Sequence, residues 1–130
     1  MAYIPCKIGG GTEKATLLWT NPNPNQSLST QTTVNANKSD YPFLIVEYKS
    51  SYSATEENHK MSTCIDRISS DYIGGYSIVI NNFARGIIIA DDKIIFAGTA
   101  YQINSSPVLS NAGYCIPLRV YGCKKIPYKF

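Results

Sequence analysis

The stretch "RGIIIADDKIIFAGTA", residues Arg85 to Ala100, decides the fold. Two apolar runs, Arg85 to Ala90 and Ile94 to Ala100, flank the short polar connection Asp91-Asp92-Lys93. β-branched and aromatic residues favour strands, and two such runs joined by a few polar residues are typical of a β-hairpin. We therefore predict two adjacent antiparallel strands in this segment.

A second segment, Phe43 to Tyr48, predicts a central strand. Leu44, Val46 and Tyr48 fall on one face of an extended chain, and the other face is also largely apolar. A strand that is apolar on both faces is usually covered on both sides. We expect this strand to lie inside a sheet rather than at its edge.

Further strands are expected where apolar and polar residues alternate between turn residues. The predicted ranges are 15–19, 29–36, 61–68, 76–80 and 115–123, with a polar loop at 50–58. No window shows a convincing helical period. Eight or so short strands separated by turns predict an all-β fold, an antiparallel β-sandwich of jelly-roll type.

Length and composition are consistent with a single domain of this kind. The chain has 130 residues and is rich in Tyr, Ile, Ser, Thr and Asn, a balance that favours strands over helices. A chain of this length can bury a core of its own. We expect residues 15–130 to form the domain and residues 1–14, which contain a triple glycine, to form an N-terminal arm and hinge.

Charge and hydropathy argue against two classes of partner. The formal net charge is +3 and comes partly from lysines near the C-terminal end, without a basic stripe elsewhere, so we expect no nucleic-acid binding. No apolar run is long enough to cross a bilayer, and the N-terminal residues lack the pattern of a signal peptide. We therefore expect no membrane insertion and no export signal.

The residue pattern predicts neither a metal site nor a cofactor. The cysteines at positions 6, 64, 115 and 123 are widely spaced, which favours reduced thiols and lacks the short gap of a zinc knuckle. His59, the only histidine, lies near Ser62 and Cys64 but without an evident third orienting group. The acidic pairs Glu56-Glu57 and Asp91-Asp92 fall in predicted turns, where solvated carboxylates are ordinary. We predict that the protein is not an enzyme.

The segment "LLWTNPNPNQS", residues 17–27, contains the only tryptophan, Trp19. Pro22 and Pro24 lack a backbone N–H and bias the residues before them away from helix, so the strand ends here. The asparagines at 21 and 23 can bond the backbone groups that lose ladder partners, while the Trp19 ring is expected under the edge of the sandwich. We interpret the segment as a fixed structural corner rather than an active-site loop.

The ten tyrosines exceed what a core of this size needs. Exposed tyrosine anchors protein interfaces, and it also stacks on sugar rings while its hydroxyl forms hydrogen bonds. Tyr48, Tyr52, Tyr72 and Tyr76 lie in or near predicted loops and are candidate ligand-binding residues. The alternative, in which these tyrosines are half-buried at strand ends, stays open.

Three stretches resemble a domain that is common in tailed bacteriophages and prophages: "LWTNPNP" (18–24), "SDYPFLIVEYKSS" (39–51) and "IPLRVYGCK" (116–124). In that family the domain forms small virion proteins and the C-terminal parts of tail-fibre or baseplate proteins. The resemblance covers residues 16 to 125. It implies a structural role for the motif residues Trp19, Asn21, Pro22, Asn23, Pro24, Pro117, Arg119, Tyr121 and Gly122.

The resemblance also implies a function. It points to a non-enzymatic virion protein, a tail-fibre, head-fibre or capsid-decoration component, which is made in the bacterial host cytoplasm and located in the virion. Self-association as a homotrimer, attachment to other virion proteins through the N-terminal arm, and loops that contact a host cell-surface glycan are its expected interactions. The alternative is a free-standing carbohydrate-binding module for bacterial surface glycans.

Overall fold

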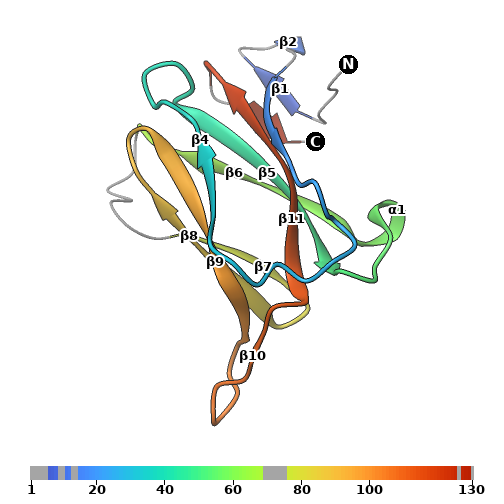
Figure 1. Cartoon of the computed structure of the whole chain (residues 1–130). Helices are drawn as coiled ribbons and strands as arrows, with labels where there is room; N and C mark the ends of the chain where they lie inside the picture. The colour runs from blue at the N-terminus through green and yellow to red at the C-terminus, as the bar shows by residue number, and fades with distance from the viewer. Residues whose placement is uncertain (1–5, 9–10, 13–14, 69–75, 126, 130) are drawn as a thin grey trace.

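The computed structural model describes residues 6–8, 11–12, 15–68, 76–125 and 127–129, which form β-strands and one short helix (Figure 1). The strands are β1 (Cys6–Ile8), β2 (Gly11–Thr12), β3 (Thr16–Thr20), β4 (Thr32–Asn35), β5 (Phe43–Ser51), β6 (Lys60–Asp66), β7 (Tyr76–Ile80), β8 (Phe83–Ile89), β9 (Lys93–Gln102), β10 (Ser110–Asn111), β11 (Tyr114–Cys123) and β12 (Pro127–Lys129). Helix α1 spans Glu56–His59. The chain is all-β, as predicted.

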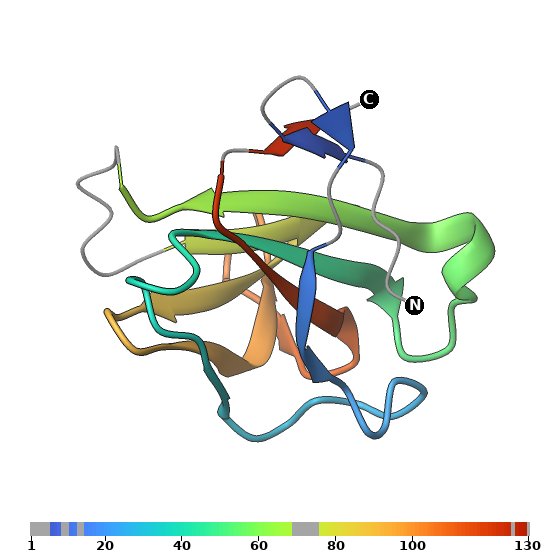
Figure 2. The same cartoon turned by 90° about the horizontal axis from the view of Figure 1, so that it is seen from above.

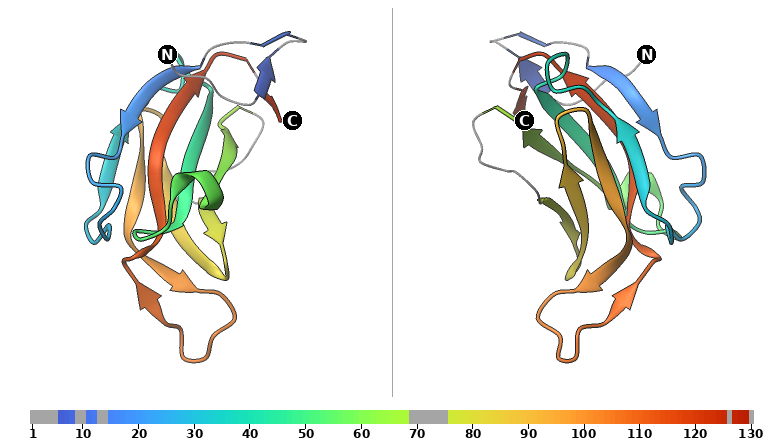
Figure 3. Two further views of the ribbon diagram at one scale, coloured as in Figure 1. Left: turned by 90° about the vertical axis from the view of Figure 1, so that its right-hand side faces the viewer. Right: turned by 60° about the vertical axis from the view of Figure 1, so that its left-hand side comes forward.

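Two antiparallel sheets face each other and form a sandwich (Figure 3). One sheet has the strand order β3-β11-β5-β6, and the other has the order β10-β9-β8-β7 with β4 also paired to β9. The structure thus confirms the antiparallel β-sandwich, and β5 is an inner strand as expected. The jelly-roll type of its connections stays a prediction.

The main core lies between these sheets. Leu44 and Val46 of β5 enter it from one side, and Ile78 and Phe96 enter it from the other. A smaller apolar cluster that includes Phe43 lies on the opposite face of β5. Because side chains alternate along a strand, β5 is apolar on both faces for the reason that its sequence indicated.

The predicted hairpin is formed by β8 and β9. Their register pairs Ile89 with Ile94, and the backbone N–H of Ala90 donates to the carbonyl of Lys93 at 3.0 Å. Both strands extend beyond the predicted ranges, to Phe83 and Gln102. The hairpin is therefore confirmed, with longer strands than the apolar runs alone indicated.

The two ends of the chain meet in a small third sheet. Strand β1 pairs with β2 on one side and with β12 on the other. In Figure 2 this small sheet lies above one end of the sandwich. In the predicted arm, β1 is therefore paired with β12 near the C-terminal end, and β2 is paired only with β1.

The predicted polar loop at 50–58 is wrong in part. Strand β5 continues to Ser51, and α1 forms one helical turn from Glu56 to His59. Four residues are too few to show a helical period in a sequence, so alternation could not find this turn. Acidic residues in its first turn and a histidine in its last are favourable for the helix dipole.

Arg85 is fully buried between the sheets, with 0% of its surface exposed. Its guanidinium donates five hydrogen bonds, all to backbone carbonyls, with donor–acceptor distances from 2.7 to 3.0 Å. The acceptors are Cys115, Leu28, Ala97, Ala112 and Tyr114. Burial lowers the pKa of Arg85 to about 10, so it remains charged at neutral pH. Arg85 thus connects β9, β11 and the segment between β3 and β4.

Arg67 has a similar role at the other end of the sandwich. It is buried, and its guanidinium donates to the carbonyls of Ala36 (2.8 Å), Ala90 (3.3 Å) and Tyr41. Burial lowers its pKa, and Asp91 acts in the opposite direction. Like Arg85, this cation bonds carbonyl groups that the β-ladders leave open.

Candidate functional site

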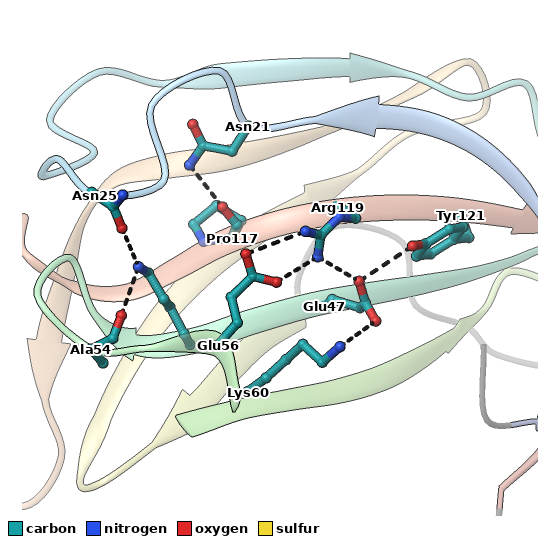
Figure 4. A network of polar contacts seen from close by, with 10 residues as sticks. Asn21, Asn25, Glu47, Ala54, Glu56, Lys60, Pro117, Arg119 and Tyr121 are labelled. Carbon is teal, nitrogen blue, oxygen red and sulfur yellow. Dashed lines mark hydrogen bonds and ion pairs between the residues drawn. The ribbon is translucent and has the colours of Figure 1, made fainter. Parts of the chain in front are cut away.

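The predicted corner is built by Asn21, which directly follows β3. Its backbone N–H donates to the carbonyl of Leu118 at 2.8 Å. Its side-chain amide donates to the carbonyl of Pro117, also at 2.8 Å (Figure 4). Its side-chain oxygen accepts a hydrogen bond from the backbone N–H of Asn23 at 2.8 Å, which closes a turn. Asn21 is buried with both ends of its amide bonded, which confirms a fixed corner at this residue.

Asn23 differs from that expectation. Its backbone N–H is bonded to Asn21, and its carbonyl accepts from the backbone N–H of Gln26 at 3.2 Å. Its side chain is exposed and makes no hydrogen bond within the described part of the chain. The prediction that this side chain bonds the backbone is therefore wrong. Pro22 is exposed and Pro24 is half-buried, and the chain turns at both.

Trp19 lies under the edge of the sandwich, as predicted. It is half-buried, and its ring packs against the main core with its centroid 5.7 Å from that of Phe96. In the described part of the chain, Arg67 Nε is the only buried side-chain N or O atom without a partner. The indole N–H of Trp19, for which that part of the chain offers no acceptor, therefore reaches solvent.

Pro117 lies near the start of β11, as expected, although β11 is an inner strand. Strand β11 pairs with β5 at Pro117, but its ladder with β3 begins only at Arg119. The missing N–H of Pro117 therefore interrupts no bond to β3. Its carbonyl instead accepts a hydrogen bond from the side-chain amide of Asn21. The motif stretches 18–24 and 116–124 therefore meet at this corner.

Arg119 is the centre of a charged network on the outer face of the four-stranded sheet (Figure 4). Its guanidinium donates to Glu47 at 3.1 Å and to both carboxylate oxygens of Glu56 at 2.9 and 3.2 Å. The ammonium of Lys60 lies 3.4 Å from Glu47, and the hydroxyl of Tyr121 donates to Glu47 at 3.4 Å. The network joins β11, β5, β6 and α1.

These contacts keep the charges of the network fixed. The hydrogen bond from Arg119 lowers the pKa of Glu56, and the same bond raises the pKa of Arg119. Burial, followed by the charge of Glu47, raises the pKa of Tyr121. Glu56 is thus an ion-paired carboxylate, which corrects the expectation of a solvated one in a turn.

Gly122 allows close packing near the end of the motif stretch 116–124. A Cβ atom at this position would lie 2.5 Å from two ring carbons of Tyr41. The ring therefore packs directly on the backbone of β11, and any other residue would displace it. Sequence motif and packing agree at this glycine.

Lys49 holds the loop that covers this face. It is 1% exposed, and its ammonium donates to the side-chain oxygen of Asn25 (2.9 Å) and to the carbonyls of Ala54 (2.9 Å) and Tyr52 (3.4 Å). Burial lowers the pKa of Lys49, while Glu56 acts against this effect. The lysine thus ties the segment after β3 to the loop before α1.

A shallow pocket of about 280 Å³ lies beside this corner. Its lining comes from the edge strands β3 and β4 and from the segment between them. Residues 21–31, which connect these two strands, can be followed in Figure 2. Its lining residues are Trp19, Asn21, Pro22, Asn23, Gln26, Ser27, Leu28, Ser29, Thr30 and Thr32. Among the described residues that line it, none is charged.

The candidate tyrosines do not form one site. Tyr48 is 4% exposed and its hydroxyl donates to the carbonyl of Val79 at 3.0 Å, so the prediction of an accessible ring is wrong for this residue. Tyr76 is half-buried, with its hydroxyl 2.7 Å from that of Thr63, and it packs against the core. Tyr52 is 47% exposed. Tyr72 lies outside the described residues.

A larger hollow of about 540 Å³ lies at the end of the sandwich where the β8–β9 turn is. Its lining includes Lys38, Ile68, Asp91 and Asp92. Ile68 is the last described residue before the range 69–75.

Three of the four cysteines are thiols within the fold. Cys64, Cys115 and Cys123 form no disulfide, which agrees with the expectation of reduced thiols for these three. Burial raises the pKa of Cys115 to about 11, and its thiol donates to the carbonyl of Phe83. His59 is exposed in α1, whereas Cys64 is half-buried in β6.

Within the described ranges, no group of three or more His, Cys, Asp or Glu side chains is arranged to hold a metal ion. The same ranges contain no helix with the length and apolarity to cross a bilayer. Comparison with protein-family models, curated proteins and solved structures finds no match for this chain.

Two features were not predicted from the sequence. One is the set of buried cations that organise the fold, and the other is the pocket beside Trp19. The buried lysine was detectable, because Lys49 continues the face of β5 that Phe43 and Ile45 share. The pocket was not, because most of its lining lies in the segment 21–30, whose path between β3 and β4 depends on contacts with distant parts of the chain.

Proposed function

We propose that this protein is a non-enzymatic structural and attachment component of a bacteriophage virion, of the tail-fibre, head-fibre or decoration type. One observation carries the proposal: the three stretches that resemble phage virion domains are the neighbouring strands β3, β11 and β5. Asn21 and Arg119 bind these strands to one another. The stretches therefore act as one structural unit, as expected of a domain whose shape is its function.

The charged groups support a non-enzymatic role. Glu47 and Glu56 are held by Arg119, and Lys49 donates to oxygen atoms of its own chain. A general acid or base must be able to exchange its proton with a substrate. Groups engaged in this way serve the fold.

Self-association is supported by the outer face of the sheet formed by β7, β8 and β9. Val79, Ile88 and Tyr101 point away from the core there and are 42–47% exposed. In the ranges 77–79, 84–88 and 95–101, none of the side chains that point away from the core is charged. An uncharged, partly apolar sheet face suits contact with further copies of the same chain, and a closed homotrimer is the assembly that we propose.

The test is the mass of the protein in solution. We expect light scattering after size exclusion to give a trimer at micromolar concentration, and Ile88→Lys to shift it toward the monomer. Thr16→Lys, at an exposed position of β3, is the matched control and leaves the mass unchanged. A wild-type monomer at this concentration would contradict self-association.

Virion placement has its own test. Antibodies against the protein should label phage particles in electron microscopy, and labelling of heads, tails or fibre tips distinguishes the three placements. The residues 1–14 are the part that we propose to contact other virion proteins. Particles that carry none of the protein would contradict the proposal.

A free-standing carbohydrate-binding module is the second candidate. The pocket beside Trp19 favours it, because an aromatic ring next to neutral polar side chains is a common way to bind sugar. A monomer that binds glycans would support this candidate over a virion component.

A further inference from the structure

The walls of the pocket at Trp19 are fixed by contacts with the rest of the sandwich. Leu28 donates its backbone N–H to Ala112 at 3.0 Å, and its carbonyl accepts a hydrogen bond from Arg85 at 3.0 Å. Lys49 bonds the side chain of Asn25. The segment that carries the polar lining is thus held at several points.

Close packing holds its last part as well. A Cβ atom at Gly98 would lie 3.1 Å from the carbonyl oxygen of Ser29 and 3.3 Å from the backbone nitrogen of Gln31. The backbone of residues 29–31 therefore lies directly on β9. A binding site whose backbone is already ordered loses little conformational entropy when a ligand enters.

Several polar groups on these walls have no partner. The side chains of Asn23, Gln26 and Ser27 are exposed and make no hydrogen bond within the described part of the chain. Trp19, whose indole N–H has no acceptor among the described residues, also lines this pocket. The amide of Asn21 is bonded at both its nitrogen and its oxygen within the protein, so we assign it to the shape of the pocket and not to ligand contact.

The chemistry of these groups selects a class of ligand. A side-chain amide both donates and accepts hydrogen bonds, as a sugar hydroxyl does, so amides pair well with vicinal hydroxyls. The half-exposed indole offers an apolar surface and one donor. Because no described lining residue is charged, the pocket has nothing to neutralise a carboxylate, sulfate or phosphate group.

We propose that the pocket beside Trp19 binds an uncharged saccharide unit, with Asn23 and Gln26 as the hydrogen-bonding residues and Trp19 as the aromatic surface. This inference deepens the attachment function proposed above and rests on it: the unit belongs to a neutral polysaccharide of the bacterial surface. In an assembly of several copies, individually weak sites would act together.

The single tryptophan makes this inference directly measurable. We would titrate the full chain with glucose, galactose, rhamnose and N-acetylglucosamine and with their oligomers, and follow the one indole N–H signal by NMR. A saturable shift with one of these neutral sugars is expected, with a dissociation constant near the millimolar range typical of one small contact surface. Polygalacturonate, an anionic polymer, should give no shift.

Variants separate this pocket from other surfaces. Asn23→Ala and Gln26→Ala should each weaken binding about tenfold or more. Asn35→Ala, an exposed asparagine of β4 outside the pocket, is the matched control and binds like the wild type. Tyr52→Ala also binds like the wild type, because this exposed tyrosine does not line the pocket.

Three results would overturn the inference: no shift of the indole signal with any neutral sugar, unchanged binding in both pocket variants, or a stronger response to the anionic polymer. The oligomeric mass is measured on the same samples. A trimer that binds no sugar would contradict the saccharide site and leave the proposed virion role standing. A monomer that binds sugar would support the saccharide site and contradict the proposed self-association.

Discussion

The buried cations and the Trp19 corner both contain many polar groups, but they differ in what those groups contact. Arg85 and Lys49 donate their hydrogen bonds to oxygen atoms of the chain itself. At the corner, Asn23 and Gln26 expose side-chain amides without partners in the described part. The difference separates the groups that hold the fold from those that are available to another molecule.

Arg85 donates its hydrogen bonds to backbone carbonyls for a simple physical reason. A buried guanidinium needs an acceptor for each of its N–H groups, and a sandwich leaves carbonyls open where ladders stop or shift register. The ladder between β8 and β9 shifts register directly after Arg85. The arginine lies where such carbonyls converge, so it compensates for the irregular pairing around it.

The largest expected effect is at Arg85. Arg85→Met removes the side-chain donor from five carbonyls, of which that of Ala112 keeps a second donor, the backbone N–H of Leu28, and we expect the free energy of unfolding to fall by about 3–5 kcal/mol. Arg85→Lys, which has three donors, should lie between wild type and Met. Urea unfolding followed by fluorescence measures both. A loss below about 1 kcal/mol for Met would show that water replaces the guanidinium.

The second-largest expected change in the free energy of unfolding is at Asn21. Asn21→Ala removes the donor for the buried carbonyl of Pro117 and the acceptor for Asn23, and we expect a loss of about 1–3 kcal/mol in the free energy of unfolding. Asn21→Asp keeps the acceptor but removes the donor, so it should restore little stability. If the Asn21→Asp variant were as stable as the wild type, the hydrogen bond to the carbonyl of Pro117 would not contribute to stability.

A smaller effect depends on pH. Since Arg119 lowers the pKa of Glu56 from its ordinary value of 4.5, the ionised carboxylate stabilises the folded state above that pH, and this contribution is lost as the pH falls through the lowered value. Because Glu56 is partly exposed, the loss in Glu56→Gln at neutral pH should stay below about 1 kcal/mol. Melting temperatures of variant and wild type should converge in acid. Curves that stay parallel down to pH 3 would contradict this assignment.

The strands could be predicted from sequence because each depends on local alternation. Strand β7 has the predicted bounds, and β8 and β9 form the predicted hairpin. The same alternation also contained a signal that the tyrosine prediction ignored. Tyr48 shares its strand face with Leu44 and Val46, so its burial follows from the pattern that placed those residues in the core.

The candidate site could be predicted only in part. The proline pattern indicated a corner at Asn21, but residues far away in the sequence supply its partners and the other supports of the pocket. Leu118 bonds Asn21 from β11, and Gly98 packs against Ser29 from β9. Register between distant strands decides such contacts, and a single sequence contains no register for them.

The smallest expected effect is at Asn23, and it tests the comparison most directly. Asn21 and Asn23 are the same residue type, two positions apart in one turn, yet of the two only Asn21 has its side-chain amide bonded to another described residue. Asn23→Ala removes an exposed amide that has no partner among the described residues, so the free energy of unfolding should change by no more than about 0.5 kcal/mol. Urea unfolding of both alanine variants under one set of conditions measures the contrast. Equal losses at the two positions would mean that the exposed amide also supports the turn, and the proposed division between structural and available polar groups would then fail at the pocket itself.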